Sequence, residues 1–291
     1  MTKSIKEILI EKALLVTALF CAVTIIIILL FIFLEGLPAI QEYGFFNFLL
    51  ESIWDPGDGE LGVLSMIVGS VYVTLIALAI SVPLSILCAT YMAEVAGDNV
   101  RKFLKPVIQT LSGIPSVVYG FFGLVIIVPF VRSHFAGTGF SVLTAAIILS
   151  IMILPTIISV SYDSLISVPR EYREASLGLG ATDWQTIRKV TIPAALPGII
   201  TAIILGMGRA IGETLAVIMV VGNVATIPAS IFDPARTLTS NIALEMSYAT
   251  GIHYNALFAT AVILFILIVI LLVVAKLVQR RYSLNIGGGT S

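Results

Sequence analysis

Six long apolar runs, separated by short polar segments, constrain this chain more than any other feature of its sequence. They cover about residues 13–34, 63–93, 106–131, 141–162, 194–222 and 255–278. A helix needs about 20 apolar residues to cross the hydrocarbon core of a bilayer, and each run meets that length. Only 11% of the residues are charged, whereas soluble domains carry about 25%. The sequence therefore predicts an all-α, multi-pass protein of the cell membrane with six transmembrane helices.

Lysine and arginine residues are concentrated in alternate loops, which predicts the orientation of the spans. They occur at both ends of the chain and after the second and fourth runs: Lys3, Lys6, Lys12, Arg101, Lys102, Lys105, Arg170, Arg173, Arg188, Lys189, Lys276, Arg280 and Arg281. The other loops hold only Arg132 and Arg236. Because positively charged loops stay in the cytoplasm, both termini and the two basic loops are predicted to be cytoplasmic.

The loop after the first run carries several acidic residues and no basic ones, so it is predicted to face outward. A solvated acidic loop is the favoured interpretation. A calcium site at Asp55–Glu60 is an alternative, although the segment lacks the ligand spacing of an EF-hand. Docking of an external partner is another.

The sequence contains none of the short motifs that mark nucleotide or catalytic chemistry. It has no P-loop of the GxxxxGK[ST] type, no HExxH or GxSxG motif, and no Cys/His metal cluster. We therefore do not expect an enzyme, and no cofactor is expected. No nucleic-acid partner is expected either.

The polar segment 163–193, between the fourth and fifth runs, has the pattern of a compact docking element. Pro169 is suited to the first turn of a helix. Gly178 and Gly180 interrupt that helix, and Thr182 or Asp183 can cap a second short one. A helix pair of this kind is suited to a groove on a soluble partner, with an amphipathic connector as the alternative.

The same segment resembles the "EAA" loop of ABC-importer permeases, the binding-protein-dependent transport system inner-membrane component family. The family pattern is Glu-Ala-Ala, three residues, Gly, nine residues, Ile, one residue, Leu-Pro. This sequence matches the spacing, with conservative changes at three positions, in Glu174, Ala175, Ser176, Gly180, Val190, Ile192 and Pro193. The resemblance implies a translocation subunit in which Glu174, Ala175 and Gly180 dock onto a separate subunit that hydrolyses ATP. The absence of a P-loop in this sequence agrees with it.

Two ionisable residues, Arg209 and Glu213, interrupt the fifth apolar run. On a continuous helix, a spacing of four residues places both on one face. An arginine in mid-membrane costs about 2.5–3.5 kcal/mol, so such residues face the bundle interior or a water-filled cavity. One interpretation is an internal ion pair that fixes packing. The other is a path for an anion, because arginine presents a fixed fork of donors to oxyanions.

In the second interpretation, Glu213 adds a filter. A carboxylate can accept the proton that phosphate keeps at neutral pH, whereas it would only repel sulfate. We expect Gly206, Gly208 and Gly212 to leave room beside the pair. Gly208 and Gly212 also form a small-xxx-small pattern for close helix approach.

Further stretches resemble the membrane subunits of phosphate ABC importers, with a closer likeness to one of the two permease types. They are "EGLPAI" after the first run, "LSGIPSVVYGFFG" in the third, "GRAIGET" and "LAVIMVVGN" in the fifth, and "TLTSNIALEMSYATGIHYNALFATA" entering the sixth. The likeness implies a type I, MetI-like permease fold and makes Arg209 and Glu213 residues needed for phosphate passage. It also implies a second permease subunit, a pair of ATPase subunits and an external phosphate-binding protein.

We expect three parts along the chain. Residues 1–62 would form the first transmembrane helix and the acidic external loop, residues 63–280 the permease core, and residues 281–291 a flexible tail. The sister permease of the same system and a permease for sulfate or molybdate remain alternatives. A stand-alone anion transporter is less favoured, because the sequence shows no inverted repeat and only one acid inside a span.

Overall fold

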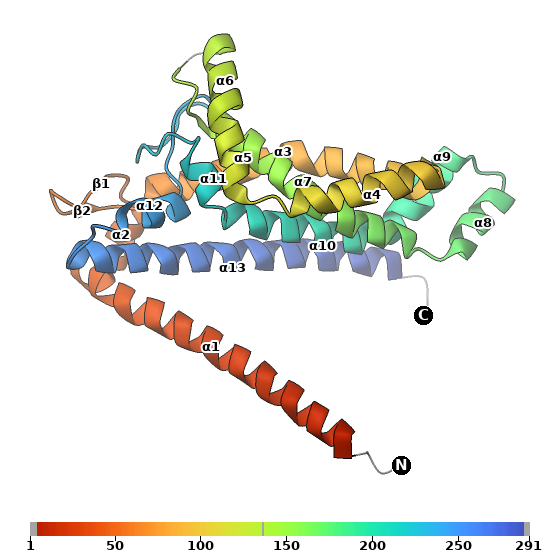
Figure 1. Cartoon of the computed structure of the whole chain (residues 1–291), viewed down its shortest axis with the longest axis horizontal. Coiled ribbons are helices and arrows are strands. Elements are labelled where there is room, and N and C mark those ends of the chain that lie inside the picture. Colours follow the sequence, from red (N-terminus) through yellow and green to blue (C-terminus); the bar gives the residue numbers. More distant parts are fainter. Residues whose placement is uncertain (1–4, 136, 288–291) are drawn as a thin grey trace.

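Helix α7 (Val142–Ile166) lies at the centre of the molecule, with α3 (Leu64–Thr90) and α10 (Ile192–Ile211) packed along it (Figure 1). The computed structural model describes residues 5–135 and 137–287. In the most apolar 18-residue stretch of α7, 67% is buried inside the protein. The corresponding share is 28% in each of the spans that contain α3 and α10. The protein core is therefore built around α7, and its neighbours keep one face for lipid or for another subunit.

Six helices in the described residues are long and apolar enough to cross a membrane. They are Leu9–Tyr43, Leu64–Val95, Ser116–His134, Val142–Ile166, Asp183–Ile211 and Ile252–Arg280. The start of α1 and the end of α13 lie toward the same end of the molecule as α8 and α9 (Figure 1). An even number of crossings places both ends of the chain on the same side of the membrane. The predicted number of six spans is confirmed.

Glycines allow α10 to approach α7 closely. A Cβ atom on Gly198 would lie 1.8 Å from the hydroxyl oxygen of Ser164, and one on Gly206 would lie 2.7 Å from Cγ1 of Ile157. Small residues favour helix association in lipid, where apolar surface alone gives no driving force between helices. These two positions therefore set the distance between α10 and α7.

The first helix, α1 (Ile5–Tyr43), diverges from the bundle along most of its length (Figure 1). It packs mainly on α13 (Ile252–Gly287), close to the outer ends of both helices. A Cβ atom on Gly36 would lie 2.8 Å from the backbone nitrogen of Ala259. Asn255 also donates a hydrogen bond of 2.8 Å to the carbonyl of Glu35. One small region therefore holds α1 to the rest of the chain.

The outward end is formed by short elements. They are α2 (Phe45–Leu50), the antiparallel strands β1 (Trp54–Asp55) and β2 (Glu60–Leu61), α11 (Leu215–Ile218) and α12 (Leu238–Glu245). The acidic segment 55–60 forms the turn of the hairpin, in which Asp55 accepts a hydrogen bond of 3.0 Å from the backbone N–H of Gly57. In the described residues, no three His, Cys, Asp or Glu side chains are grouped to hold a metal ion.

The third span differs from the expected run 106–131. Helix α4 (Asp98–Ser112) ends before Pro115, and the crossing helix begins only at Ser116 with α5 (Ser116–Phe122), followed by a π-helical segment and α6 (Val128–His134). Proline lacks a backbone N–H and disfavours helical geometry in the preceding residue, so the helix breaks here. The expected single span is wrong in its first part, which belongs to the amphipathic α4.

The fifth span also differs from the expected run 194–222, because α10 ends at Ile211 with Gly212 as its C-cap. The chain then forms the short α11 and an irregular loop. Three π-helical segments interrupt the described spans, at Tyr91–Val95, Gly123–Ile127 and Ile187–Thr191. At the other end of the chain, α13 continues to Gly287, into the expected tail 281–291, and residues 288–291 lie outside the described residues.

Candidate functional site

The segment 163–193 forms the helix–turn–helix that its sequence predicts, from α8 (Arg170–Gly178) and α9 (Asp183–Thr186). We call residues 170–186 the docking hairpin. A capping box fixes the start of α9. The backbone N–H of Thr182 donates to Gln185 Oε1 at 3.0 Å, and the N–H of Gln185 donates to the Thr182 hydroxyl at 3.3 Å.

Two further features make the docking hairpin a defined unit. The hydroxyls of Ser176 and Thr186 are hydrogen bonded at 2.9 Å, which holds α8 against α9. Gly180 has a φ of 85°, a conformation that residues with a Cβ atom rarely adopt. The turn therefore requires glycine at this position, which gives the family pattern a physical reason.

The predicted docking residues Glu174, Ala175 and Gly180 are all exposed. Beside them lie two large apolar side chains, Leu179 at 90% and Trp184 at 63% exposure. Exposed apolar side chains on a polar, ordered element indicate a protein interface. The sequence analysis did not single out Leu179 and Trp184 as contact residues. Their position beside a glycine turn in an otherwise polar segment was the available signal.

Arg209 lies in the last turn of α10 and is partly buried. Its Nη1 atom donates a hydrogen bond of 3.1 Å to the hydroxyl of Thr156, on α7. Among the described residues, it forms no ion pair with any carboxylate. Of the two interpretations of the Arg209–Glu213 pair, the internal ion pair is therefore not found in the described chain, and Thr156 is the side chain that holds Arg209.

Glu213 lies outside α10, because the helix ends before Gly212. The two residues thus do not share one helical face, and this expectation is corrected. The Glu213 Oε1 atom accepts a hydrogen bond of 3.0 Å from the backbone N–H of Ala216, in the first turn of α11. The backbone carbonyl of Glu213 accepts a second bond of 2.9 Å from the Thr239 hydroxyl. The carboxylate therefore accepts a hydrogen bond from the Ala216 N–H, which has no acceptor within α11 because it lies in the first turn of that helix.

The three glycines near Arg209 have different surroundings. Gly206 packs tightly on Ile157, whereas no atom lies within 4 Å of a Cβ placed on Gly208. A Cβ atom placed on Gly212 would meet only backbone carbonyl oxygens of the preceding helical turn. The nearest is the carbonyl oxygen of Gly208, at 3.5 Å. The small-xxx-small pair Gly208 and Gly212 therefore makes no helix contact within the described chain, and it leaves an open face beside Arg209.

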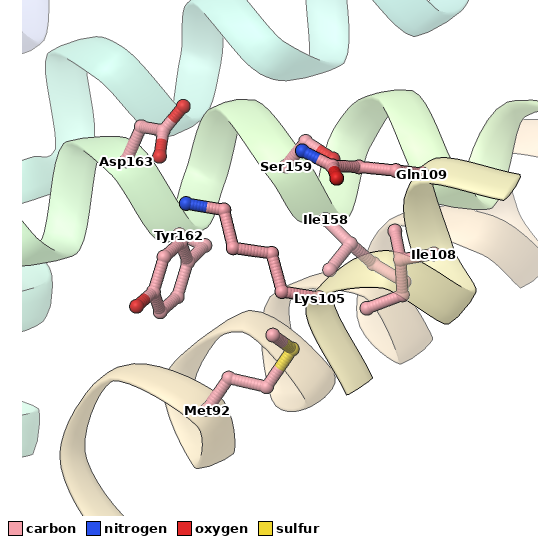
Figure 2. Close-up of a pocket in the computed structure, with 8 residues that line it drawn as sticks. All are labelled: Met92, Lys105, Ile108, Gln109, Ile158, Ser159, Tyr162 and Asp163. Atoms are coloured by element: carbon pink, nitrogen blue, oxygen red, sulfur yellow. The ribbon is translucent and has the colours of Figure 1, made fainter. Parts of the chain in front are cut away.

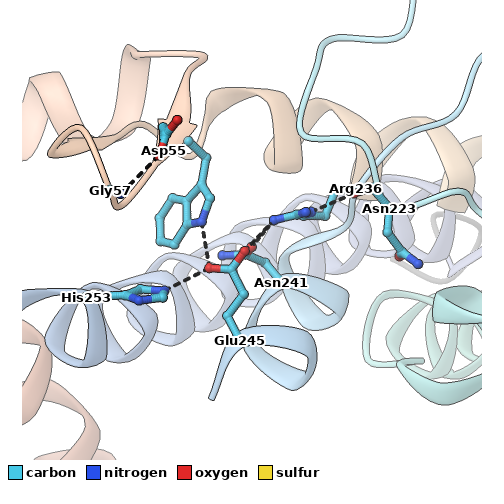
Figure 3. A network of polar contacts seen from close by, with 8 residues as sticks. Asp55, Gly57, Asn223, Arg236, Asn241, Glu245 and His253 are labelled. Atoms are coloured by element: carbon cyan, nitrogen blue, oxygen red, sulfur yellow. Dashed lines mark hydrogen bonds and ion pairs between the residues drawn. The ribbon is translucent and has the colours of Figure 1, made fainter. Parts of the chain in front are cut away.

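A polar network at the outward end was not anticipated from the sequence (Figure 3). The buried Glu245 carboxylate is 2.6 Å from Arg236 Nη1, and its other oxygen is 2.8 Å from both Trp54 Nε1 and His253 Nε2. The Glu245 side chain, on α12, thus joins the β1–β2 hairpin, the loop before α12 and the start of α13. Burial and the Glu245 carboxylate raise the pKa of the nearby Tyr248, while Arg236 opposes the shift. The available signal for this network in the sequence was Arg236, one of only two basic residues in the loops predicted to face outward.

A small cavity of about 50 Å³ lies between α4 and α7 near the cytoplasmic end (Figure 2). The ammonium group of Lys105 lies 5.7 Å from the ring centroid of Tyr162, at cation–π distance. Met92 and Ile158 contribute apolar walls. The volume accommodates a few water molecules and is well below the roughly 300–1,000 Å³ of a typical ligand pocket, so we do not assign a substrate to it.

The described residues thus combine six helices long and apolar enough to cross a membrane with an exposed helix–turn–helix between the fourth and fifth of them. The chain belongs to the family described as "Binding-protein-dependent transport system inner membrane component", whose model matches residues 81–284. It is thus the membrane component of a transport system. The family inferred from the Glu174–Gly180 pattern is confirmed.

Relatives support this assignment over most of the chain. It is 44% identical over 261 residues to the "Probable ABC transporter permease protein YqgH" of Bacillus subtilis (strain 168), which covers 87% of this chain and 84% of that protein. It is 33% identical over 288 residues to the "Phosphate transport system permease protein PstC" of Haemophilus influenzae, which covers 91% of both. Both are proteins that the chain resembles over most of its length.

Solved structures show the same fold at lower identity. A chain of a bacterial alginate ABC transporter superposes with a TM-score of 0.66 at 17% identity, covering 95% of this chain and 96% of that one. A chain of the MetNI methionine ABC transporter superposes with a TM-score of 0.55 at 23% identity, covering 76% and 94%. The expected MetI-like, all-α permease fold is confirmed.

Proposed function

We propose that this chain is a PstC-type permease subunit of an ATP-driven importer that carries inorganic phosphate into the cytoplasm. The observation that supports it best is the Arg209 guanidinium, which lies in a membrane span and is held by the neutral Thr156 hydroxyl at 3.1 Å. Within the described chain no carboxylate neutralises this charge. A charged donor fork in a low dielectric favours an oxyanion, and ionisable groups inside membranes commonly mark such paths. The names of the PstC relatives point to phosphate.

Glu213 is proposed to act on the same path, one turn beyond Arg209 at the break after α10. One carboxylate oxygen is engaged by the Ala216 N–H at 3.0 Å. The other oxygen has no partner among the described residues, so it can accept a hydrogen bond from a protonated anion. Phosphate carries such a proton at neutral pH and sulfate does not, which would favour phosphate.

The path would run beside the open face at Gly208, between this chain and a second permease subunit of the PstA type. Leu205, on the same helix, is also exposed. Large apolar side chains on α4 and α5 are exposed as well: Val100, Phe103, Val107, Leu111, Val117, Val118 and Phe121. Lipid or a companion subunit must cover these faces, and a companion would also close the path around Arg209.

The docking hairpin is proposed to enter a groove of a PstB-type ATPase subunit, with Glu174, Ala175 and Gly180 at the contact and Leu179 and Trp184 as apolar anchors. ATP binding would move the ATPase pair, and the hairpin would carry this motion to the spans. An external phosphate-binding protein of the PstS type would deliver the anion to the outward end.

The test is phosphate uptake in phosphate-starved cells that lack this gene. The cells would be complemented with the wild-type chain, Arg209→Gln or Arg209→Lys, after equal membrane levels have been verified. We expect wild-type uptake, loss with glutamine, and a partial rate with lysine, which keeps the charge without the fork. Excess unlabelled sulfate or molybdate should not compete.

Equal uptake with Arg209→Gln would make the arginine a packing residue and remove it from the path. Failure of the wild-type chain to restore uptake would exclude phosphate as substrate. Competition by sulfate or molybdate would favour the permease for another oxyanion.

A further inference from the structure

Arg173 points from the docking hairpin toward the bundle, whereas its neighbour Glu174 is exposed. Its Nη2 atom forms an ion pair of 2.5 Å with Glu94, whose side chain is only 8% exposed. The same Nη2 donates a hydrogen bond of 3.1 Å to the carbonyl of Leu165, at the end of α7. One side chain therefore joins the hairpin to the cytoplasmic ends of two spans.

Glu94 lies in the π-helical segment Tyr91–Val95, which ends the second span. Single π turns are rare and are frequent at functional sites, because they hold an extra residue in a weaker local hydrogen-bond pattern. Arg101, in the first turns of α4, donates to the carbonyls of Met92 and Ala96, both at 3.1 Å. The π segment thus connects the hairpin with both α3 and α4.

The ion pair is not explained by stability alone. A buried ion pair gains little over well-packed apolar side chains, because removing both charges from water is costly. Its distinctive property is geometric, since two charged groups hold one relative position of α8 and the π segment. On its other side the hairpin continues without a break from α9 through Ile187–Thr191 into α10, so the Glu94–Arg173 pair is a second link, to different spans.

We propose that the Glu94–Arg173 ion pair is the positioning link that transmits a displacement of the docking hairpin to α3 and α4. The inference rests on the proposed function, in that the hairpin receives the motion from an ATPase subunit. Glu174 and the apolar anchors face the partner, and Arg173 faces inward to the spans. Contact with the ATPase and transmission of its motion are thus assigned to different side chains of α8.

The experiment uses the complete importer, reconstituted in proteoliposomes with its ATPase subunits and binding protein. The variants are Glu94→Gln, Arg173→Gln and the reversed pair Glu94→Arg with Arg173→Glu. Arg170→Gln, exposed on the same helix, is the matched control. Two rates are measured on each sample, ATP hydrolysis and uptake of labelled phosphate, together with the amount of ATPase subunit that co-purifies.

We expect each single variant to keep its ATPase subunits and to hydrolyse ATP, but to consume about tenfold more ATP per phosphate imported. The reversed pair should recover most of the coupling, and Arg170→Gln should match wild type. A merely structural role would lower both rates together and leave their ratio unchanged.

Three results would overturn the proposal. They are an unchanged ratio in both single variants, loss of the ATPase subunits from the single variants, and uncoupling that the reversed pair does not repair. The wild-type sample separates this test from the proposed function. If it imports no phosphate but its hydrolysis responds to another oxyanion, the substrate assignment fails while the ratio remains measurable with that anion.

Discussion

Arg209 and Thr156 form a hydrogen bond of 3.1 Å that joins the last turn of α10 to the middle of α7. The acceptor is a neutral hydroxyl, so the contact fixes the direction of the guanidinium without removing its charge. Hydrogen bonds to charged groups contribute about 1.5–3 kcal/mol when they are compared with their absence. Thr156 is therefore expected to position Arg209 for the anion.

Replacing Thr156 with valine should weaken transport while the fold persists, because valine has the same shape but lacks the hydroxyl. We expect the KM for phosphate to rise about tenfold, the lower end of that range of energies. Uptake against phosphate concentration in proteoliposomes measures it. Thr156→Ser retains the hydroxyl and should stay near wild type. A valine variant with an unchanged KM would show that Arg209 needs no such support.

Gly198→Ala should destabilise the packing of α10 on α7, because its Cβ atom would lie 1.8 Å from the Ser164 hydroxyl oxygen. Overpacking in a tight contact costs about 1–3 kcal/mol. The measurement is thermal unfolding of the chain in detergent. Gly208→Ala is the control, since nothing lies within 4 Å of its Cβ position. Equal melting temperatures for the two variants would contradict the close approach of the helices.

Gly180→Ala should impair docking of the ATPase subunit, because the residue has a φ of 85° and alanine at such a position costs about 1–2 kcal/mol. Gly178→Ala is a matched control. Both sites are open, with no atom within 4 Å, and only Gly180 has a positive φ. The amount of ATPase subunit that co-purifies should fall for Gly180→Ala alone. Equal loss in both variants would argue against a conformational cause.

Glu245→Gln should destabilise the outward end, because it removes the charge that Arg236 contacts at 2.6 Å. Breaking a buried ion pair costs about 3–5 kcal/mol. Thermal unfolding should reveal the loss, and Asp55→Asn at the exposed turn should have little effect. The variant should also lower the pKa of Tyr248, since the Glu245 carboxylate raises that pKa and Arg236 lowers it. A Tyr248 titration at unchanged or higher pH would contradict this arrangement.

Hydropathy and loop charge were sufficient to predict the number of spans, and motif spacing was sufficient to predict the docking hairpin. The breaks inside apolar runs were not predicted. Glycine and proline are tolerated in transmembrane helices, so Gly212 and Pro115 do not reveal whether the helix continues. That depends on which groups satisfy the freed backbone, such as the Glu213 carboxylate that accepts from Ala216 at 3.0 Å.

The contacts of Arg209 and Glu245 depend on tertiary structure in the same way. Thr156 is 53 residues from Arg209, and Trp54 is 191 residues from Glu245. No periodicity along a single helix connects such positions. The sequence therefore indicated that an arginine in a span must face a polar partner or a substrate path. It gave no information on which helix supplies the hydrogen-bond acceptor.

The contact between Gly36 and Ala259 has a consequence for biosynthesis. Of the six described spans, the ribosome delivers α1 to the membrane first and α13 last. The main packing partner of α1 is therefore absent until the other four described spans have been made. Through that interval α1 must persist in lipid without its packing partner, which the uninterrupted apolar run of about residues 13–34 permits. Among the described spans, the one made first is thus the one that waits longest for its native neighbour.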